Sequence, residues 1–562
     1  MVYTIGQPPD DTSPTETTSL LSSQNHQPGT LAQPEPDPEN SRQEHDNPTE
    51  GIALADPPSP RKLALIMSAT WIGVFFAALD TTIVATLTGP ISSSFNSLSL
   101  LSWLATGYLI ANSACQPLSG KLTDIFSRRW GLVFSNVFFG VGTVICGVAP
   151  NAGTIIAGRV IAGVGGGGLT CITTYITSDL IPLRRRGLWQ GYGNLVYGLG
   201  MGLGGVFGGV LSDRLSWRWA FLLQVPFIVV SAVMVFFLVD IPVNPSTKPA
   251  LSRIDFLGSA FLVASLVLLL MGLNTGGNQL PWDHPAIIAS LVLSAVTFVV
   301  FVYVESNPRW APEPVLPVVL IAKTRTVLSA CLANWFATMA TFLAIYYVPL
   351  YLQIRGLSAT AAGLRVVPLA GAMSVGSLSS GYIMRATGRY YLQIVGVMLT
   401  FVVGAALICT FQLDSPGWMT FVFPTPLGFA YGAMLTITLV AMISAVAHEH
   451  QAVITAASYA FRSTGSTIGI TIAGAVFQNI LTTELRGKYG DMPGSEGVIR
   501  RIRDSFEGLK HLPQGWDKGV VLEIYMDALR GAFIAGLGLA VLAAVTGLFM
   551  KEHILHKNLA RK

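Results

Sequence analysis

The chain has 562 residues, of which 51% are hydrophobic and only 11% are charged, against roughly 25% in soluble domains. Its mean hydropathy is +0.56 and its formal net charge is +4, which is small for this length. This composition excludes a soluble globular protein and gives no support for nucleic-acid binding. It predicts a protein that crosses a membrane many times.

Residues 1–62 are predicted to form a disordered cytosolic tail, because this region is rich in proline and acidic residues and poor in large apolar ones. No basic region followed by an apolar run opens the chain, so the first membrane helix is expected to direct insertion. Within the tail, Glu16, Leu20 and Leu21 match the acidic dileucine pattern that cytosolic adaptors read when sorting cargo to lysosome-like compartments. Binding to a clathrin adaptor is therefore expected, and a chance match to this short pattern is the alternative.

Long continuous apolar runs predict about fourteen transmembrane helices, because about 20 apolar residues are needed to cross the hydrocarbon core. The predicted spans are 63–87, 101–120, 130–149, 154–177, 187–211, 219–240, 256–273, 286–304, 327–352, 360–384, 391–411, 420–446, 452–480 and 526–550. Lysine and arginine follow the second and fourth spans and are absent from the short loops after the first and third. This bias predicts that both termini are cytosolic.

The spans divide into six, two and six, which predicts an all-α polytopic membrane fold with two six-helix halves around a central cavity. The predicted parts are the tail at 1–62, the N-terminal half at 63–240, a linker with two extra helices at 241–320, the C-terminal half at 321–550 with a long lumenal or extracellular loop at 481–525, and a cytosolic tail at 551–562.

Asp80 is a carboxylate inside the first span, where a charge is costly and usually functional. Burial disfavours the ionised form of a carboxylate and a nearby cation favours it, so such a group can gain and lose protons as access to it alternates. We expect Asp80 to bind the transported proton or the substrate. The alternative is a permanently ionised carboxylate bonded to the hydroxyls of Thr81 or Thr82.

The segment GKLTDIFSRR after the second span contains Gly120, Asp124, Arg128 and Arg129. A glycine allows close helix approach, and an aspartate at a helix end opposite basic residues can form a charge contact that holds a cytosolic gate in one state. The segment resembles the loop motif of major facilitator transporters, from which it departs at two positions. The alternative role of the basic residues is anchoring on the cytosolic side alone.

In the fourth span, Arg159 lies in apolar surroundings, where a guanidinium needs an acidic or carbonyl partner. Asp80 is the candidate partner. The surrounding segment IIAGRVIAGVGGGG resembles a motif of the same family, and the resemblance implies a role in proton coupling. Asp179 lies near the cytosolic end of this span, where a charge contact at the gate is expected and attraction of the substrate is the alternative.

In the fifth span, Gly200, Gly204, Gly208 and Gly209 recur with a spacing that favours close packing of a neighbouring helix. Their pattern resembles the antiporter motif of major facilitator transporters, although Gly205 stands where proline is usual. The resemblance implies antiport, whereas packing alone is the simpler interpretation.

Polar residues in two other spans are candidates for the cavity, with helix packing as the alternative. They are Tyr108, Asn112 and Gln116 in the second span, and Asn334, Tyr346 and Tyr347 in the first span of the C-terminal half. Arg462 is a further charge within the penultimate span, where it either balances an acid or lies near the cytosolic interface.

The segments LDTTIV around Asp80, SWRWAFLLQVPF and FRSTGSTIGI resemble the fourteen-helix drug:proton antiporter group of the major facilitator superfamily. The resemblance covers roughly residues 63–550, and TIVAT followed by PIS is most similar to fungal vacuolar basic amino acid transporters. It implies a proton-coupled antiporter that moves basic amino acids from the cytosol into the vacuole. The alternatives are a plasma-membrane multidrug or secondary-metabolite efflux pump and a non-transporting transceptor or scaffold.

The expected partners are a small-molecule substrate, either a cationic amino acid or an amphipathic drug, together with protons and the lipid bilayer. No phosphate-binding loop is present, so a gradient rather than ATP is expected to supply energy, and no enzymatic activity is predicted. The five cysteines lie in apolar segments without CxxC spacing, so neither a metal nor another cofactor is expected.

Overall fold

The computed structural model describes residues 59–553, apart from 96–99, 182, 242–254, 277–279, 308–309, 311–313, 317, 358, 448–449, 493, 505–512 and 514. The side chains of some other helical residues, Asp124 among them, are also outside the description. The predicted sorting signal at Glu16, Leu20 and Leu21 lies outside the described residues.

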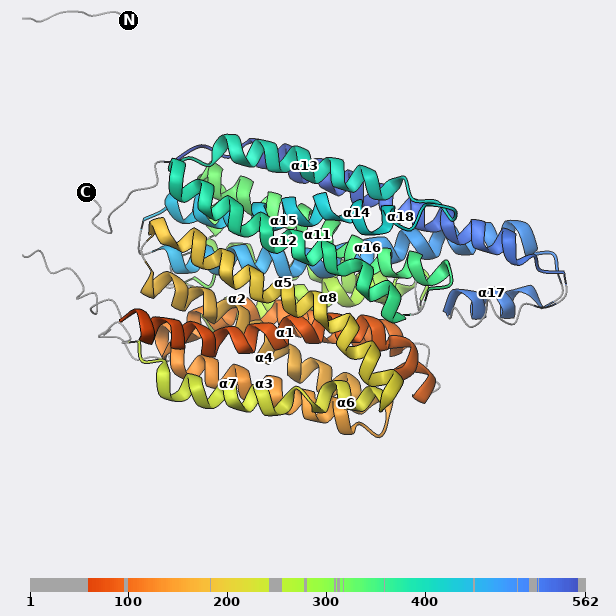
Figure 1. Cartoon of the computed structure of the whole chain (residues 1–562), viewed down its shortest axis with the longest axis horizontal. Coiled ribbons are helices and arrows are strands. Elements are labelled where there is room, and N and C mark those ends of the chain that lie inside the picture. The colour runs from red at the N-terminus through yellow and green to blue at the C-terminus, as the bar shows by residue number, and fades with distance from the viewer. Residues whose placement is uncertain are drawn as a thin grey trace, which may run out of the picture. The chain divides into compact units, whose positions relative to one another are not determined.

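Regular structure in the described residues is helical, apart from one isolated bridge between Gly276 and Leu280, which confirms the all-α prediction (Figure 1). The helices are α1 (Pro60–Phe95), α2 (Leu100–Ile125), α3 (Arg128–Val148), α4 (Ala152–Leu180), α5 (Leu183–Arg214), α6 (Trp217–Leu222), α7 (Val225–Leu238), α8 (Phe256–Thr275), α9 (Pro285–Ser306), α10 (Val318–Lys323), α11 (Arg325–Ile354), α12 (Ala359–Thr387), α13 (Tyr391–Cys409), α14 (Met419–Val422), α15 (Pro424–Ser444), α16 (Gln451–Tyr489), α17 (Ser495–Asp504) and α18 (Lys518–Leu548).

Thirteen segments of the described residues are long and apolar enough to cross a membrane. Helix α2 covers a predicted span but is not among them, because polar side chains such as Asn112 and Gln116 lower its hydropathy. The count of fourteen and the cytosolic position of both termini stay predictions.

Two predicted spans are interrupted by proline, which lacks the amide donor that a continuous helix needs. The span at 219–240 is divided into α6 and α7 just before Pro226. The span at 420–446 is divided at Phe423, where Pro424 begins α15. Hydropathy alone did not predict these breaks, because the apolar run continues across them.

The segment at 481–525, predicted to be a loop, is helical over much of its described length. Helix α16 continues to Tyr489, α17 follows, and α18 begins at Lys518 with Asp517 as its N-cap. Ile499 and Ile502 of α17 are buried, whereas its arginines raise its polarity. A hydropathy window misses such segments because their charged faces offset their apolar faces.

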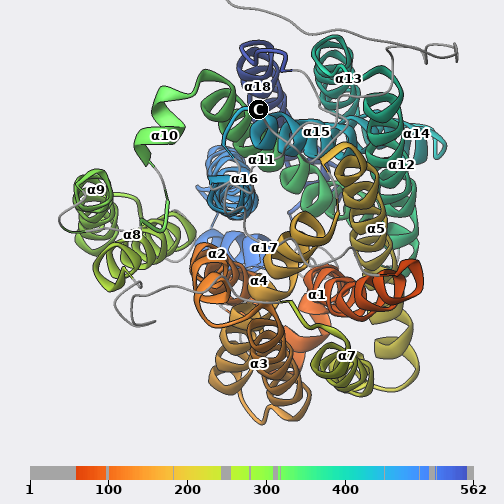
Figure 2. The ribbon, with the colours of Figure 1, turned by 90° about the vertical axis from the view of Figure 1, so that its left-hand side faces the viewer.

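Figure 2 shows α1–α7 and α11–α18 as two groups of helices, which meet where α5 packs along α12 and α2 packs along α16. The two extra helices, α8 and α9, pack on each other, and α8 lies beside α2 and α16. Ser265 donates to the Ser294 carbonyl at 3.2 Å, and Ser294 donates to the Ser265 carbonyl at 3.0 Å. These reciprocal bonds join the extra helices into a hairpin.

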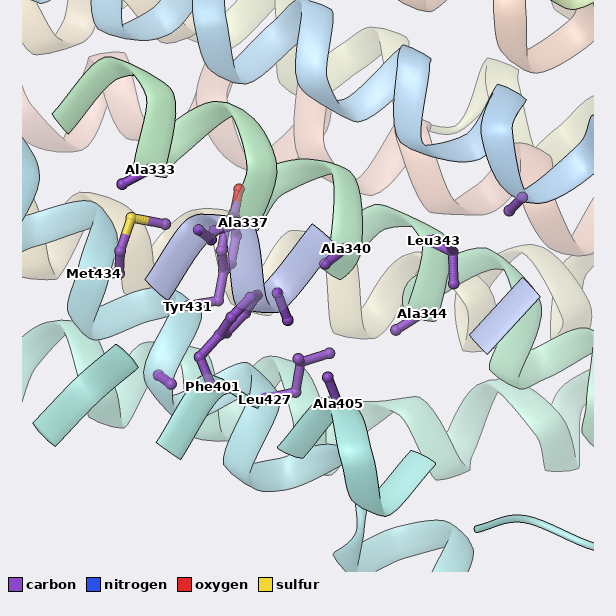
Figure 3. Packing of buried hydrophobic residues seen from close by; sticks show 14 of the residues in the cluster. Ala333, Ala337, Ala340, Leu343, Ala344, Phe401, Ala405, Leu427, Tyr431 and Met434 are labelled. Carbon is purple, nitrogen blue, oxygen red and sulfur yellow. The ribbon is translucent and has the colours of Figure 1, made fainter. Parts of the chain in front are cut away.

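The core of the C-terminal half depends on small side chains of α11. Ala333 and Ala337 lie over α13 and α15, whose Phe401 and Tyr431 belong to the same buried cluster (Figure 3). Small residues let helices approach closely, which matters in a bilayer because lipid is as apolar as the protein interior. This packing fixes α11 and α15, which both contribute to the cavity described below.

Candidate functional site

A cavity lies between the two groups of helices, with walls from α1, α2, α4 and α5 on one side and α11, α15 and α16 on the other. Most of its described lining residues are polar or aromatic. They are Trp71, Val74, Ala77, Thr81, Tyr108, Leu109, Asn112, Gln116, Thr170, Thr173, Thr174, Thr177, Trp189, Gln190, Gly193, Asn194, Tyr197, Thr338, Phe342, Tyr431, Tyr459, Arg462, Ser463 and Ser466. Arg462 is the one charged residue in this described lining, which contains no carboxylate.

The sequence-derived candidates Asp80 and Arg159 meet inside the N-terminal half. Nη1 of Arg159 donates to Oδ2 of Asp80 at 2.5 Å, and both side chains are 1% exposed. Nε of Arg159 donates to the Leu104 carbonyl at 2.9 Å, and the guanidinium lies 4.4 Å from the centroid of the Tyr108 ring. Three helices, α1, α4 and α2, therefore supply one buried charged cluster.

Tyr108 separates this charged pair from the cavity. Its ring contacts Arg159 and also lines the cavity, whereas neither Asp80 nor Arg159 is among the described lining residues. Oδ1 of Asp80 is buried without a hydrogen-bond partner in the described structure. This oxygen is a position where a proton can bind without displacing an existing contact.

The three candidates on α2 all line the cavity. Gln116 donates to Oδ1 of Asn112 at 2.7 Å, and Ser463 of α16 donates to the same oxygen at 3.3 Å. The hydroxyls of Ser113 and Ser463 are 2.8 Å apart. The polar face of α2 thus points both into the cavity and toward the other half.

The three candidates on α11 are not among the described lining residues, because other contacts engage their side chains. Asn334 is fully buried, donating to Ser458 at 3.3 Å and accepting from Thr438 at 3.0 Å. Tyr346 donates to the Thr81 carbonyl of α1 at 3.4 Å. Tyr347 lies edge-on to Phe477, with 5.8 Å between ring centroids.

Sequence reasoning missed two polar faces of the cavity. On α4, the lining threonines Thr170, Thr173, Thr174 and Thr177 recur at positions i, i+3, i+4 and i+7, which is the spacing of one helix face. On α5, the lining residues are Trp189, Gln190, Gly193, Asn194 and Tyr197. The same periodicity, visible in the sequence, was the signal that could have found them.

The two halves are joined around the cavity by bonds of mostly uncharged groups. Thr174 and Tyr459 hydroxyls are 2.6 Å apart, and Asn194 donates to Ser377 at 2.9 Å. Nearer the helix ends, Arg186 donates to Oε1 of Gln451 at 2.9 Å. Each bond of this kind contributes on the order of 1 kcal/mol net, so the halves are held together without a large barrier to separation.

The predicted gate residues form two ion pairs of different burial. Arg128 donates to Asp179 at 3.1 Å in a partly buried pair, whereas Arg129 pairs at 2.7 Å with Asp240, whose side chain is 78% exposed. Gly120 lies against the Tyr175 ring. Asp179 is thus placed at a helix-end charge contact and not in the described cavity wall, and Asp124 has no described side chain.

The predicted glycine face of α5 packs on two helices. Gly200, Gly204 and Gly208 lie against α1, where a β-carbon at Gly204 would overlap Thr82 and the Leu79 carbonyl. Gly209 instead lies against Thr360 of α12. Helix α5 therefore touches both the helix that carries Asp80 and a helix of the opposite half.

Arg462 projects from α16 with its guanidinium 4.7 Å from the centroid of the Tyr459 ring. The hydroxyl of Tyr459 also accepts from Gln190 at 3.4 Å. No ion pair links Arg462 to a carboxylate among the described residues. Nor does any group of three potential metal ligands occur in the described part of the chain.

Comparisons with known proteins agree with this arrangement. A profile of the Major Facilitator Superfamily matches residues 70–470. Multidrug resistance protein fnx1 of Schizosaccharomyces pombe is 39% identical over 502 residues, covering 88% of this chain and 94% of the relative. Vacuolar membrane amino acid uptake transporter fnx2 of the same species is 33% identical over 490 residues, covering 87% and 84%.

Among solved structures, a bacterial homologue of the human lysosomal transporter Spinster, in an inward-facing and unoccupied conformation, has a similar fold. Its TM-score is 0.57 at 17% sequence identity, and the match covers 87% of this chain and 97% of that one.

Proposed function

We propose that this protein is a proton-coupled antiporter that carries basic amino acids from the cytosol into the vacuole. The chain belongs to the Major Facilitator Superfamily, so it is an integral membrane transporter of small molecules and not an enzyme. The buried Asp80–Arg159 pair beside the cavity is the observation that carries this proposal. An acidic vacuolar lumen would supply the protons whose exit drives uptake.

Proton binding at Asp80 would weaken its attraction to Arg159, because a neutral carboxyl no longer offers a full counter-charge. Asp80 lies on α1, whose next residue, Thr81, accepts the bond from Tyr346 of the opposite half. Helix α1 also packs on the glycine face of α5, which in turn packs on α12. A shift of α1 would therefore act directly on the contact with Tyr346 and, through α5, on the contact with α12.

Two observations support the proposed vacuolar location: the similarity to fnx2, whose name describes vacuolar amino acid uptake, and the acidic dileucine pattern. The similarity to fnx2 also supports the proposed amino acid substrate. A plasma-membrane drug or metabolite exporter is the second candidate. It is favoured by the similarity to fnx1 and by the aromatic lining residues Trp71, Trp189 and Tyr197, on which an amphipathic compound could stack.

Uptake of radiolabelled arginine into isolated, energised vacuoles tests the proposal. Vacuoles containing the protein should accumulate arginine faster than vacuoles lacking it, and a protonophore should abolish the difference. Asp80→Asn should remove coupled uptake while the protein remains in the membrane, and Asp527→Asn, which changes the exposed ion pair with Arg530, serves as the control. Full uptake by Asp80→Asn would refute the coupling role.

Location is tested separately with a fluorescently tagged chain carrying Leu20→Ala and Leu21→Ala. We expect the unaltered chain at the vacuolar membrane and the variant displaced from it. Surface location of both would favour the exporter, and absence of transport of amino acids and drugs alike would favour a non-transporting scaffold.

A further inference from the structure

Arg462 is a cavity-lining arginine with no described carboxylate partner, unlike two buried or partly buried arginines of the N-terminal half. Arg159 pairs with Asp80, and Arg128 pairs with Asp179. Arg462 is partly exposed and lines the cavity instead. An arginine cannot lose its proton in a protein, so the cavity holds a permanent positive charge.

The contacts of Arg462 prepare it for a ligand. The Tyr459 ring, 4.7 Å away, supports the guanidinium on one face, and the hydroxyl of Tyr459 is itself fixed by Thr174 and Gln190. A planar guanidinium presents donors in a fork that matches a carboxylate with two parallel hydrogen bonds. The cavity therefore favours an anionic group at this position, and its described lining offers no competing carboxylate.

We propose that Arg462 binds the carboxylate of the transported substrate, so that the cavity selects amino acids and other organic carboxylates over cations that lack this group. This inference deepens the proposed function and rests on it. The cationic side chain of a basic amino acid would then lie against aromatic faces, for which Trp71 and Trp189, 6.0 Å apart between ring centroids, are the candidates.

Pairs of compounds that differ only in the carboxylate test the proposal without any variant. Arginine and agmatine share the guanidinium, and lysine and cadaverine share the ammonium on the side chain, but agmatine and cadaverine lack the carboxylate. Purified protein in proteoliposomes with an acidic interior should take up radiolabelled arginine and lysine. Unlabelled arginine should compete, whereas agmatine and cadaverine should compete at least tenfold more weakly.

Arg462→Gln should raise the KM for arginine by about 10-fold to 100-fold, the loss expected for charge-assisted hydrogen bonds, and should remove the preference for arginine over agmatine. Arg462→Lys keeps the charge but not the fork, so an intermediate KM is expected. Arg365→Gln is the matched control, because Arg365 also lies against a ring, 5.3 Å from the centroid of Phe421, yet does not belong to the described lining. It should retain both KM and preference.

The outcomes separate this inference from the proposed function. If arginine uptake is driven by protons and agmatine competes as strongly as unlabelled arginine, the role of Arg462 is refuted but the proposed amino acid antiport is not. An unchanged KM and preference in Arg462→Gln would lead to the same conclusion. Transport of a carboxylate-free cationic dye such as ethidium, without amino acid transport, would overturn both, as would failure to transport any compound of the set.

Discussion

Removing either member of the Asp80–Arg159 pair is expected to destabilise the protein, and Asp80→Asn should cost more than Arg159→Gln. Both side chains are 1% exposed, so either change leaves a buried group without its counter-charge. Losing one partner of a buried pair costs about 3–5 kcal/mol. The two variants differ because a lone carboxylate can take up a proton, whereas a lone guanidinium stays charged.

In Asp80→Asn, Arg159 keeps its bond to the Leu104 carbonyl and its contact with the Tyr108 ring, but neither carries a full negative charge. The full cost of about 3–5 kcal/mol is therefore expected. In Arg159→Gln, protonation of Asp80 relieves the buried charge, leaving about 1–3 kcal/mol for lost hydrogen bonds and packing. The double variant joins two neutral amides and should cost less than the sum of the single changes by about 2–3 kcal/mol.

Thermal unfolding of the purified protein in detergent measures these differences. With an unfolding entropy of about 2.1 cal/mol/K per residue, the roughly 450 described residues correspond to a loss of roughly 1 °C of Tm per kcal/mol. Asp80→Asn should therefore lower Tm by about 3–5 °C. Arg159→Gln, with its smaller expected cost, should lower Tm by about 1–3 °C.

Equal losses of Tm in the two single variants would refute the reasoning, because they would mean that loss of the counter-charge costs the same free energy for the carboxylate as for the guanidinium. Strict additivity in the double variant would also refute it. Tyr108→Phe is a suitable control, since it keeps the ring beside Arg159 and removes a neutral hydroxyl, whose bond to the Ala77 carbonyl is 3.4 Å long.

Three further predictions concern the packing and the contacts between the halves. Gly204→Ala should reduce transport more than tenfold and destabilise the protein by about 1–3 kcal/mol, because the added β-carbon would overlap α1. Gly371 has open space around it, so Gly371→Ala should change neither uptake nor Tm. Asp179→Asn should lower Tm by about 1–2 °C, and Asp240→Asn, in an exposed pair, by less than about 1 °C. Tyr459→Phe should change the turnover rate of vesicle uptake more than the KM, because it removes hydroxyl bonds between the halves but keeps the ring beside Arg462. An effect on KM alone would contradict this prediction.

The sequence predicted the helices well because membrane spans are long apolar runs, and it identified Asp80 and Arg159 because buried charges are rare in such runs. It could not show that two residues 79 positions apart meet, since that depends on how α1 and α4 pack. The cavity was harder to predict. Lipid and protein interior are equally apolar, so hydropathy does not show which face of a helix points inward. The sequence made Asn334 and Tyr347 candidates for the cavity, and neither is among its described lining residues.

The separation of the two charged sites limits how coupling can work. Asp80 is behind Tyr108 in the N-terminal half, while Arg462 faces the cavity from α16 in the other half. In the mechanism proposed above, a substrate in the cavity therefore does not displace a proton from Asp80 by direct contact. Coupling has to pass through Tyr108, which touches both the cavity and Arg159, or through α1, whose Thr81 lines the cavity and accepts from the opposite half. In the proposed mechanism, substrate and proton would then compete for a position of α1 rather than for one carboxylate, which is consistent with a cavity whose described lining contains no acidic residue.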